Sequence, residues 1–385
     1  MKVLHLFSNH KWTGPAEPAL NLCWALRAEG VETEFACARG PDITVNRIVT
    51  EARARGIEPI LKFRLNKHRH PIFDWLDVLA LRRYENKCWF DLIHCHLDND
   101  HRIAANAERP FMPPNMMHFP KPIVRSSYEG EGITNYSRLR WPIQQTAFLI
   151  EPSRRALERD AGTFDLPPDR IAVVPGAVDT TRFDPNRPLP DARAKLGIPA
   201  DAFVVGIVAR MQTHRHYEDL WDAAARLMAE FAHVHVLVVG RGTKQETVGM
   251  APVHEHGIED RVHFTGFVSG DDYVAALAAM TVKVYLVPGS DATCRAVREA
   301  LVMGVPCVVA DRGMLSEIVD DGVTGIVFGT AAAQLHVALR GLVITPARVS
   351  EMQQYALGIA RERYALAAQA AAVAVIYRRI VTLAQ

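Results

Sequence analysis

The sequence of 385 residues has little of several features that mark specialised classes of protein. Its 44 lysines and arginines are nearly balanced by 43 aspartates and glutamates, so the net charge of +1 favours neither nucleic acid nor an acidic partner. The six cysteines include no C-x-x-C pair, which argues against a disulfide framework and for reduced thiols in a cytosolic protein. With 49% hydrophobic residues, the composition is that of an ordinary globular protein.

Long apolar runs are also missing. We expect no signal peptide, because Met1-Lys2 leads directly into a short strand-like run. We expect no transmembrane helix either, because Arg378 and Arg379 interrupt the Ala-rich C-terminal segment. These absences predict a soluble, cytoplasmic protein, which could still touch the inner face of a membrane.

The sequence does contain a regular alternation of strand-like and helix-like segments. In the first half the strands are expected at 2–7, 32–38, 57–63, 91–95, 123–126, 147–151 and 171–174. In the second half they are expected at 204–208, 235–239, 262–264, 282–287, 307–310 and 325–328. Such alternation predicts an α/β protein with parallel sheets, and the length requires two doubly wound domains. The boundary is expected in the stretch 175–199, which holds five prolines.

The most informative stretch runs from Pro288 to Gly304, where a polar loop leads into a helix. Asp291 and Glu299 are eight residues apart, which on a helix is roughly 80° around the axis and about 12 Å along it. With Asp291 in the loop, the two carboxylates suit a ligand with two hydroxyl-bearing ends. Alternatively, Asp291 only caps the helix and Glu299 is a solvated residue paired with Arg295.

Loops that follow strands in the first half carry further candidates. Gly14 precedes a helix, where it either lets the backbone approach a ligand or belongs to an ordinary turn. Because the motif G-x-G-x-x-G is missing, dinucleotide binding is weakly supported. His94 and His96 share one face of a strand, which favours a polar cleft with a hydrogen-bonding histidine over a metal site. Glu129 and Glu131 flank Gly130 in a loop, where they either contact sugar hydroxyls or lie in a solvated turn.

Candidates in the second half point to phosphate. Arg210 and Arg215 follow a strand and open a helix, where two guanidinium groups could hold a diphosphate, although arginines are also common on surface loops. Gly240 and Gly266 end strands at places where a base or ribose could approach the backbone. In the first half, a basic cluster (Lys62, Arg64, Lys67 and Arg69) is either a solvated surface or a contact for an anionic acceptor or lipid headgroups.

Over nearly its whole length, and most strongly from Val173 to Phe328, the chain resembles the retaining glycosyltransferases of family 4, the glycosyl transferases group 1. The motifs that carry the resemblance are VPGAVDTTRF at 174–183, Arg210 with Arg215, the acidic pair Asp291 and Glu299, GMLSEIV at 313–319 and DGVTG at 321–325. GPAE at 14–17 and HCH at 94–96 extend it to the first half. The chain departs from the family where Pro15 replaces a glycine, Arg215 a lysine, His216 a glycine and Asp291 a glutamate, and where Tyr128 stands in place of the active-site histidine of many members.

The resemblance implies the GT-B fold, in which two Rossmann-like domains face each other across a cleft. Residues 1–178 would bind the acceptor, 179–364 would bind the donor, and the last helix, within 365–385, would return to the first domain. It implies that Arg210, Arg215, Asp291 and Glu299 carry the chemistry. Donor contacts would come from Gly14, Gly240, Gly266, Ala292, Thr293, Cys294 and Arg295, and acceptor contacts from His96, Tyr128 and Glu129.

The activity implied is retaining transfer of a hexosyl unit from a UDP- or GDP-sugar to a glycan, a lipid-linked acceptor or a small molecule, as in polysaccharide biosynthesis. Neither a metal nor a further cofactor is expected, because the arginines supply positive charge at the diphosphate. An epimerase of the same fold and a non-catalytic nucleotide-sugar-binding protein remain alternatives. A Rossmann oxidoreductase is disfavoured because the glycine fingerprint is missing.

Overall fold

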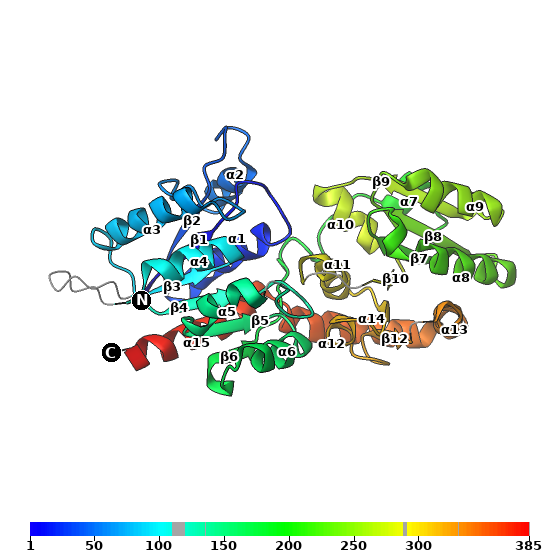
Figure 1. The fold of residues 1–385 in the computed structure, drawn as a ribbon. Helices are drawn as coiled ribbons and strands as arrows, with labels where there is room; N and C mark the ends of the chain where they lie inside the picture. The colour runs from blue at the N-terminus through cyan, green and yellow to red at the C-terminus, as the bar shows by residue number, and fades with distance from the viewer. Residues whose placement is uncertain (110–119, 135, 288–290, 330, 385) are drawn as a thin grey trace. The chain divides into compact units, whose positions relative to one another are not determined.

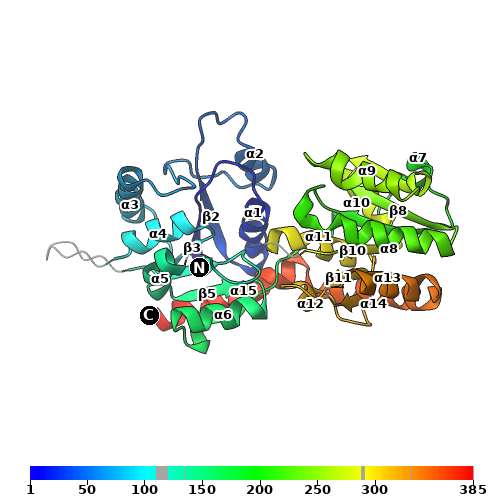
Figure 2. The ribbon, with the colours of Figure 1, turned by 45° about the vertical axis from the view of Figure 1, so that its right-hand side comes forward.

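The computed structural model describes residues 1–109, 120–134, 136–287, 291–329 and 331–384, which form two compact α/β units (Figures 1 and 2). Unit 1 contains Met1–Ala177, Ser290–Ala292 and Leu366–Gln385. Unit 2 contains Val178–Gly289 and Thr293–Ala365. Each unit is built on its own six-stranded parallel sheet.

The sheet of unit 1 has the strand order β2-β1-β3-β4-β5-β6. Its strands are β1 (Lys2–Phe7), β2 (Glu32–Cys37), β3 (Leu92–Cys95), β4 (Ile123–Ser126), β5 (Phe148–Glu151) and β6 (Ile171–Val173). The central strands are buried on both faces, which explains why their sequences are nearly continuous apolar runs. The strand order reverses between β1 and β3, and the carboxyl ends of strands beside such a point are where ligands of open α/β sheets bind.

Helices cover both faces of this sheet. They are α1 (Ala16–Ala25), η1 (Leu26–Glu29), α2 (Arg47–Ala54), α3 (Pro71–Glu85), α4 (Asp98–Ala107), α5 (Tyr136–Gln144), α6 (Arg154–Phe164), η2 (Pro168–Arg170) and α15 (Leu366–Ala384). Helices α1 and α15 share one core cluster, and α3 and α4 share another. Asn46 caps α2 by accepting hydrogen bonds from the N–H groups of Ile48 and Val49, which is why that helix begins at Arg47.

Helix α15 packs on unit 1, as the resemblance implied. Its residues Ala370, Val373 and Tyr377 are buried in one cluster with Val3 of β1 and Leu92 of β3. By length and composition alone, its segment Leu366–Leu383 could cross a membrane, with a mean hydropathy of 1.4, and it is the single such helix in the described part of the chain. The expectation that Arg378 and Arg379 remove such a segment was therefore wrong.

Unit 2 has the strand order β12-β11-β10-β7-β8-β9, so the order reverses between β7 and β10. Its strands are β7 (Phe203–Val208), β8 (Val234–Val239), β9 (Val262–Gly266), β10 (Val282–Tyr285), β11 (Cys307–Ala310) and β12 (Gly325–Phe328). Its longer helices are α8 (Tyr217–Glu230), α10 (Gly270–Ala278), α11 (Asp291–Val302), α13 (Ala332–Val343) and α14 (Pro346–Arg363). Its shorter ones are α7 (Ala192–Leu196), η3 (Thr213–Arg215), η4 (Glu246–Met250), α9 (Ala251–Glu255), η5 (Glu259–Arg261) and α12 (Leu315–Ile318).

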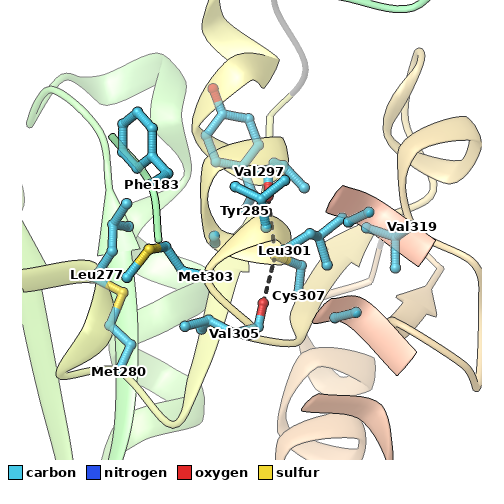
Figure 3. Packing of buried hydrophobic residues seen from close by; sticks show 14 of the residues in the cluster. Phe183, Leu277, Met280, Tyr285, Val297, Leu301, Met303, Val305, Cys307 and Val319 are labelled. Carbon is cyan, nitrogen blue, oxygen red and sulfur yellow. Dashed lines mark hydrogen bonds between the residues drawn. The ribbon is translucent and has the colours of Figure 1, made fainter. Parts of the chain in front are cut away.

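The core of unit 2 lies in two clusters, one of which is shown in Figure 3. In this cluster Val297 and Leu301 of α11 pack beside Tyr285 of β10 and Cys307 of β11 (Figure 3). The Cys307 thiol donates towards the carbonyls of Val297 and Val305, at 3.7 and 3.6 Å. This packing fixes α11 against the sheet, and α11 carries both acidic candidates.

Two predicted features were wrong. The segment 57–63 is not a strand, because it pairs with β2 only at Ile60, and the preceding Pro59 has no N–H group to extend the ladder. Asp291 does not lie in the loop before α11, because it is the first residue of that helix. A carboxylate in the first helical turn is stabilised by the positive end of the helix dipole.

Candidate functional site

The loops at the carboxyl edge of the unit 1 sheet are held together by Asp100 of α4. One carboxylate oxygen accepts a hydrogen bond from the backbone N–H of Ser8, after β1, at 2.7 Å. The other accepts from the N–H groups of His96 and Leu97, after β3, at 3.1 and 2.9 Å. Burial raises the pKa of Asp100 to about 7. Because one side chain ties two loops across the point where the strand order reverses, this edge is a built site rather than a set of solvated turns.

A row of buried histidines follows these loops into the sheet. His96 Nε2 lies 3.0 Å from His5 Nδ1, and His96 Nδ1 lies 2.8 Å from the hydroxyl of Tyr128. His94 bonds to Ser126 at 2.8 Å and to the hydroxyl of Tyr377 on α15. The rings of His94 and His96 stack 4.4 Å apart, which confirms that the two residues share one strand face.

The histidine row does not have the geometry of a metal site as it stands. Nitrogens of His5, His94 and His96 lie within 4.8 Å of one another. However, the three rings are stacked or tilted face to face, so the lone pairs in their ring planes do not converge on one point. Five of the six ring nitrogens also have hydrogen-bond partners, and only His5 Nε2 has none among the described residues. The row is better suited to orienting the Tyr128 hydroxyl.

Replacing His5 by glutamine is expected to make stability less sensitive to acid. Burial lowers the pKa of His5 to about 3, whereas in the unfolded chain it binds a proton near pH 6.5. Its neutral burial therefore costs no stability above pH 6.5, and stability is lost as the pH falls from 6.5 towards 3. Between pH 7 and pH 5 the variant should lose about 2 kcal/mol less than the wild type, as measured by urea unfolding at both pH values.

The matched control for His5 is His68→Gln, because His68 is exposed. Its replacement should change the difference in unfolding free energy between pH 7 and pH 5 much less than His5→Gln does. An identical pH dependence for wild type and His5→Gln would contradict the neutral state of the buried ring. Absolute stability is not the readout, because the substitution also changes packing within the histidine row.

The remaining unit 1 candidates differ in how they are placed. Tyr128 is partly buried, and burial holds the pKa of its hydroxyl well above the usual range. Glu129 is partly buried, and its carboxylate accepts a hydrogen bond from the N–H of Thr134 at 2.8 Å, so it also closes its own loop. Gly14 lies exposed in the turn before α1. Of these three, Tyr128 is the one tied to the histidine row.

In unit 2, Arg210 and Arg215 lie in the loop that follows β7, beside the point where the strand order reverses. Arg210 is exposed, whereas the Nε of Arg215 is buried and has no hydrogen-bond partner among the described residues. A buried guanidinium N–H without an acceptor is unfavourable unless a ligand supplies one. His216, where the resemblance has glycine, adopts a left-handed conformation with φ 55°.

Two glycines shape the backbone around this loop. Gly240 has φ 131°, and a Cβ at this position would lie 2.4 Å from the carbonyl oxygen of Ala209. The loop that carries Arg210 can therefore lie against the end of β8 only if residue 240 is glycine. Gly266 has φ 67°, and its carbonyl accepts a hydrogen bond from the N–H of Gly240 at 2.9 Å. Both glycines thus have a structural reason to be there, whether or not a ligand contacts them.

Glu299 is buried on α11 and both of its carboxylate oxygens are engaged. Oε2 accepts from the hydroxyl of Tyr273 at 2.5 Å, and Oε1 pairs with Arg295 Nε at 3.1 Å. The pairing with Arg295 is therefore present, but Glu299 is not the solvated residue of the simpler interpretation. Burial of Tyr273 and its hydrogen bond to Glu299 hold the pKa of the Tyr273 hydroxyl well above its usual range. The carboxylate is fixed in position rather than free to swing.

The other candidates on α11 differ in burial and in which of their atoms could contact a donor. Asp291 is buried in the first turn. The side chain of Cys294 is fully buried in the core of unit 2, so only its backbone remains to contact a donor. Ala292 and Thr293 are helical, and their side chains lie outside the described residues.

Sequence reasoning missed three residues that organise these two edges. Asp100 lies in α4, Tyr273 in α10 and Lys283 in β10, and none of the three was predicted as a site residue from the sequence. Burial lowers the pKa of Lys283 to about 8, and its ammonium donates to the carbonyl of Ala296 on α11. A charged residue within the apolar run VKVYLV was the available signal, because lysine is almost never buried without a partner.

Two family models match the chain, one in each half. Residues 13–182 match the model described as Glycosyltransferase Family 4, and residues 190–357 match the model described as Glycosyl transferases group 1. The chain is 29% identical to a D-inositol 3-phosphate glycosyltransferase of Saccharomonospora viridis over 68% of this chain and 65% of that protein. The match to the corresponding protein of Acidothermus cellulolyticus also covers 65% of its length, at 28% identity. The chain thus aligns with just under two thirds of these relatives.

Solved structures resemble the chain over almost its full length. A glycosyltransferase from Rickettsia africae superposes with a TM-score of 0.80 at 13% identity, covering 99% of this chain and 98% of that one. Anabaena Alr3699/HepE in complex with UDP gives a TM-score of 0.77 at 18% identity, covering 98% of this chain and 100% of that one. At such identities the likeness concerns the fold.

Proposed function

Because the chain belongs to glycosyltransferase family 4, the glycosyl transferases group 1, and has the GT-B fold, we propose that it transfers a hexosyl unit with retention from a UDP- or GDP-sugar to an acceptor hydroxyl. Unit 2 binds the donor, and unit 1 binds a glycan, glycolipid or small-molecule acceptor. The observation that carries the proposal is Arg215 Nε at the carboxyl edge of the unit 2 sheet: it has no hydrogen-bond partner in the described part of the chain, and a diphosphate oxygen would provide one.

In the proposed reaction the residues of unit 2 act on the leaving group. As the bond between sugar and diphosphate breaks, negative charge grows on the diphosphate, and Arg210 and Arg215 stabilise it. Glu299, held by Tyr273 and Arg295, orients the ribose hydroxyls. Asp291 and the N–H groups after it orient the hexose. The acceptor hydroxyl attacks on the face that the leaving group departs from, and a diphosphate oxygen takes its proton.

The relatives narrow the substrates to be tried first. The Anabaena protein was solved with UDP and with UDP-glucose, which supports a uridine nucleotide as donor. The curated relatives are named for D-inositol 3-phosphate, which supports a phosphorylated acceptor. Both inferences extend properties of those proteins to this chain.

Transfer is expected to continue in EDTA, because the arginines rather than a metal ion offset the charge on the diphosphate. The assay incubates the purified protein with UDP-glucose or GDP-mannose and an acceptor pool, and identifies the anomeric configuration of the new linkage by NMR. Loss of turnover in EDTA that Mg²⁺ restores would contradict the metal-independent mechanism. Conversion of the donor without an acceptor would identify an epimerase, and donor binding without any turnover would identify a binding protein.

We also propose that unit 1 touches anionic membranes through the basic cluster. Lys62, Arg64, Lys67 and Arg69 are exposed, and Ile72 and Trp75 on the following helix α3 are 65% and 60% exposed. Exposed aromatic and aliphatic side chains beside lysine and arginine suit a headgroup interface.

Replacing both Lys62 and Arg64 by glutamine is expected to weaken binding to phosphatidylglycerol vesicles about 30-fold, at about 1 kcal/mol per basic residue. Co-sedimentation measures this, and phosphatidylcholine vesicles are the control because they carry no net charge. Equal binding to both kinds of vesicle, or unchanged binding by the double variant, would remove the proposed membrane contact.

A further inference from the structure

A large cavity in unit 1 lies apart from the histidine row, between α3 and α4. The two helices lie side by side (Figures 1 and 2), and the cavity between them has a volume of about 570 Å³. Its apolar lining comes from both helices: Trp75, Val78, Leu79 and Ile103. A volume of this size is within the range of about 300–1,000 Å³ that is usual for small-molecule sites.

Hydrogen bonds at both ends hold these helices in place around the cavity. Towards the start of both helices, Asn99 donates to the Asp74 carboxylate at 3.0 Å. Towards their ends, the Arg82 guanidinium donates to the carbonyls of Ala107 and Arg109, each at 2.8 Å. Because the pair is pinned at both ends, the spacing of the two helices around the cavity, hereafter the groove, is fixed.

At one end the groove adjoins a smaller, cationic cavity of about 120 Å³. Arg69 and Arg102 line both cavities, and Lys67 and Arg138 line the smaller one. Among the described residues, the side chains of Arg69, Arg102 and Arg138 make no hydrogen bond and no ion pair. Burial lowers the pKa of Arg102, and the positive charges of Arg69 and Arg138 lower it further. The carboxylates of Asp74 and Asp98 act in the opposite direction, but among the described residues neither forms an ion pair with these three guanidinium groups.

The acidic residue of this cavity is already neutralised. Asp98 lines the smaller cavity, and its carboxylate pairs at 3.1 Å with Arg125. Arg125 is 4% exposed, and its Nε and Nη1 have no partner among the described residues. Positive charge therefore exceeds negative charge here, and guanidinium groups bind phosphate oxygens with good geometry.

We propose that this groove binds the acceptor as a phosphate-bearing amphiphile, with its phosphate among Arg69, Arg102 and Arg138 and its apolar chain between α3 and α4. The inference rests on the proposed function, because it names the acceptor that unit 1 would hold. The small cavity includes Asp98, the first residue of α4, two residues after His96. A bound phosphate would therefore bring the adjoining hydroxyl of the acceptor to the carboxyl edge of the sheet, where Tyr128 lies.

Isothermal titration with decyl phosphate, below its micelle concentration and without donor, tests the groove. The protein is expected to bind decyl phosphate at least tenfold more tightly than inorganic phosphate or neutral decyl maltoside. Arg102→Gln should weaken binding at least tenfold by removing the shared guanidinium. Leu79→Glu should do the same, because it places a negative charge beside the apolar chain. Arg83→Gln is the control, because Arg83 is exposed on α3 and does not line either cavity.

The proposal is overturned if inorganic phosphate binds as tightly as decyl phosphate, or if Arg102→Gln and Leu79→Glu bind decyl phosphate as the wild type does. Binding to anionic vesicles but not to monomeric decyl phosphate also overturns it, since that result reflects the membrane surface alone. Titration with UDP is run in parallel on the same samples. If UDP binds and decyl phosphate does not, the proposed acceptor groove is wrong, but the proposed function stands. If decyl phosphate binds and UDP does not, the result supports the groove and counts against the donor site.

Discussion

Replacing Arg215 by alanine is expected to lower kcat by about 10²- to 10³-fold, the usual effect of removing one preorganised group that stabilises transition-state charge. The guanidinium lies at the carboxyl edge of the unit 2 sheet, and its buried Nε has no partner among the described residues. Among the described residues this Nε makes no hydrogen bond that the substitution would break, so we expect little loss of stability. Arg210→Ala should act in the same direction, with a smaller effect because Arg210 is exposed. Steady-state kinetics with an identified donor measures both changes.

Two further variants make this prediction specific. Arg215→Lys should recover part of the lost rate, because an ammonium supplies charge without the bidentate geometry of guanidinium. Arg226→Ala, an exposed arginine on α8 in the same unit, should leave kcat unchanged. Wild-type turnover by both Arg215→Ala and Arg210→Ala would contradict their role at the diphosphate.

Replacing Glu299 by alanine or glutamine is expected to weaken donor binding about 10- to 100-fold, the usual contribution of a hydrogen bond to a charged group. Glu299→Ala also removes the acceptor of the Tyr273 hydroxyl and the ion pair with Arg295, so part of its effect would be on stability. Glu299→Gln keeps one oxygen that can accept from Tyr273, but it removes the charge and the second acceptor, which pairs with Arg295. Titration with UDP, together with thermal unfolding with and without UDP, separates the two effects.

Tyr273→Phe is the control for Glu299, because it removes the hydroxyl that holds the carboxylate and leaves the carboxylate itself. It should cost about 1 kcal/mol of stability and weaken UDP binding less than Glu299→Gln does. If Glu299→Gln binds UDP as tightly as the wild type, the carboxylate is a structural partner of Arg295 and not a ribose ligand.

The parts of the fold that local pattern controls could be predicted. The run VVGIV predicts the strand at 204–208, and the structure has β7 at Phe203–Val208. The prediction of a strand at 57–63 was wrong because the apolar residues have the pattern of a strand, whereas Pro59 lacks the N–H group that would extend the ladder. The predicted start of α11 was wrong because a polar residue near the start of a helix is as common in the first turn as at the cap.

The site residues that follow a single strand could be predicted from the sequence. The hydrogen bonds between residues from distant segments could not. Arg210 and Arg215 follow a single strand, so their position could be predicted from the alternation alone. The bond of Glu299 to Tyr273 joins residues 26 apart, and that of Ser8 to Asp100 joins residues 92 apart. No spacing rule predicts such pairs, because the tertiary fold decides which side chains face each other.

The placement of α15 has a consequence for how the chain acquires its structure during synthesis. Residues 1–177 leave the ribosome before any of unit 2, yet their core is completed by Ala370, Val373 and Tyr377. Tyr377 also supplies a hydrogen bond to His94, 283 residues earlier. Contacts over such separations form slowly because a long loop must close first. We therefore expect the N-terminal unit to mature last, with the apolar groove that α15 fills open to chaperones until unit 2 has been made.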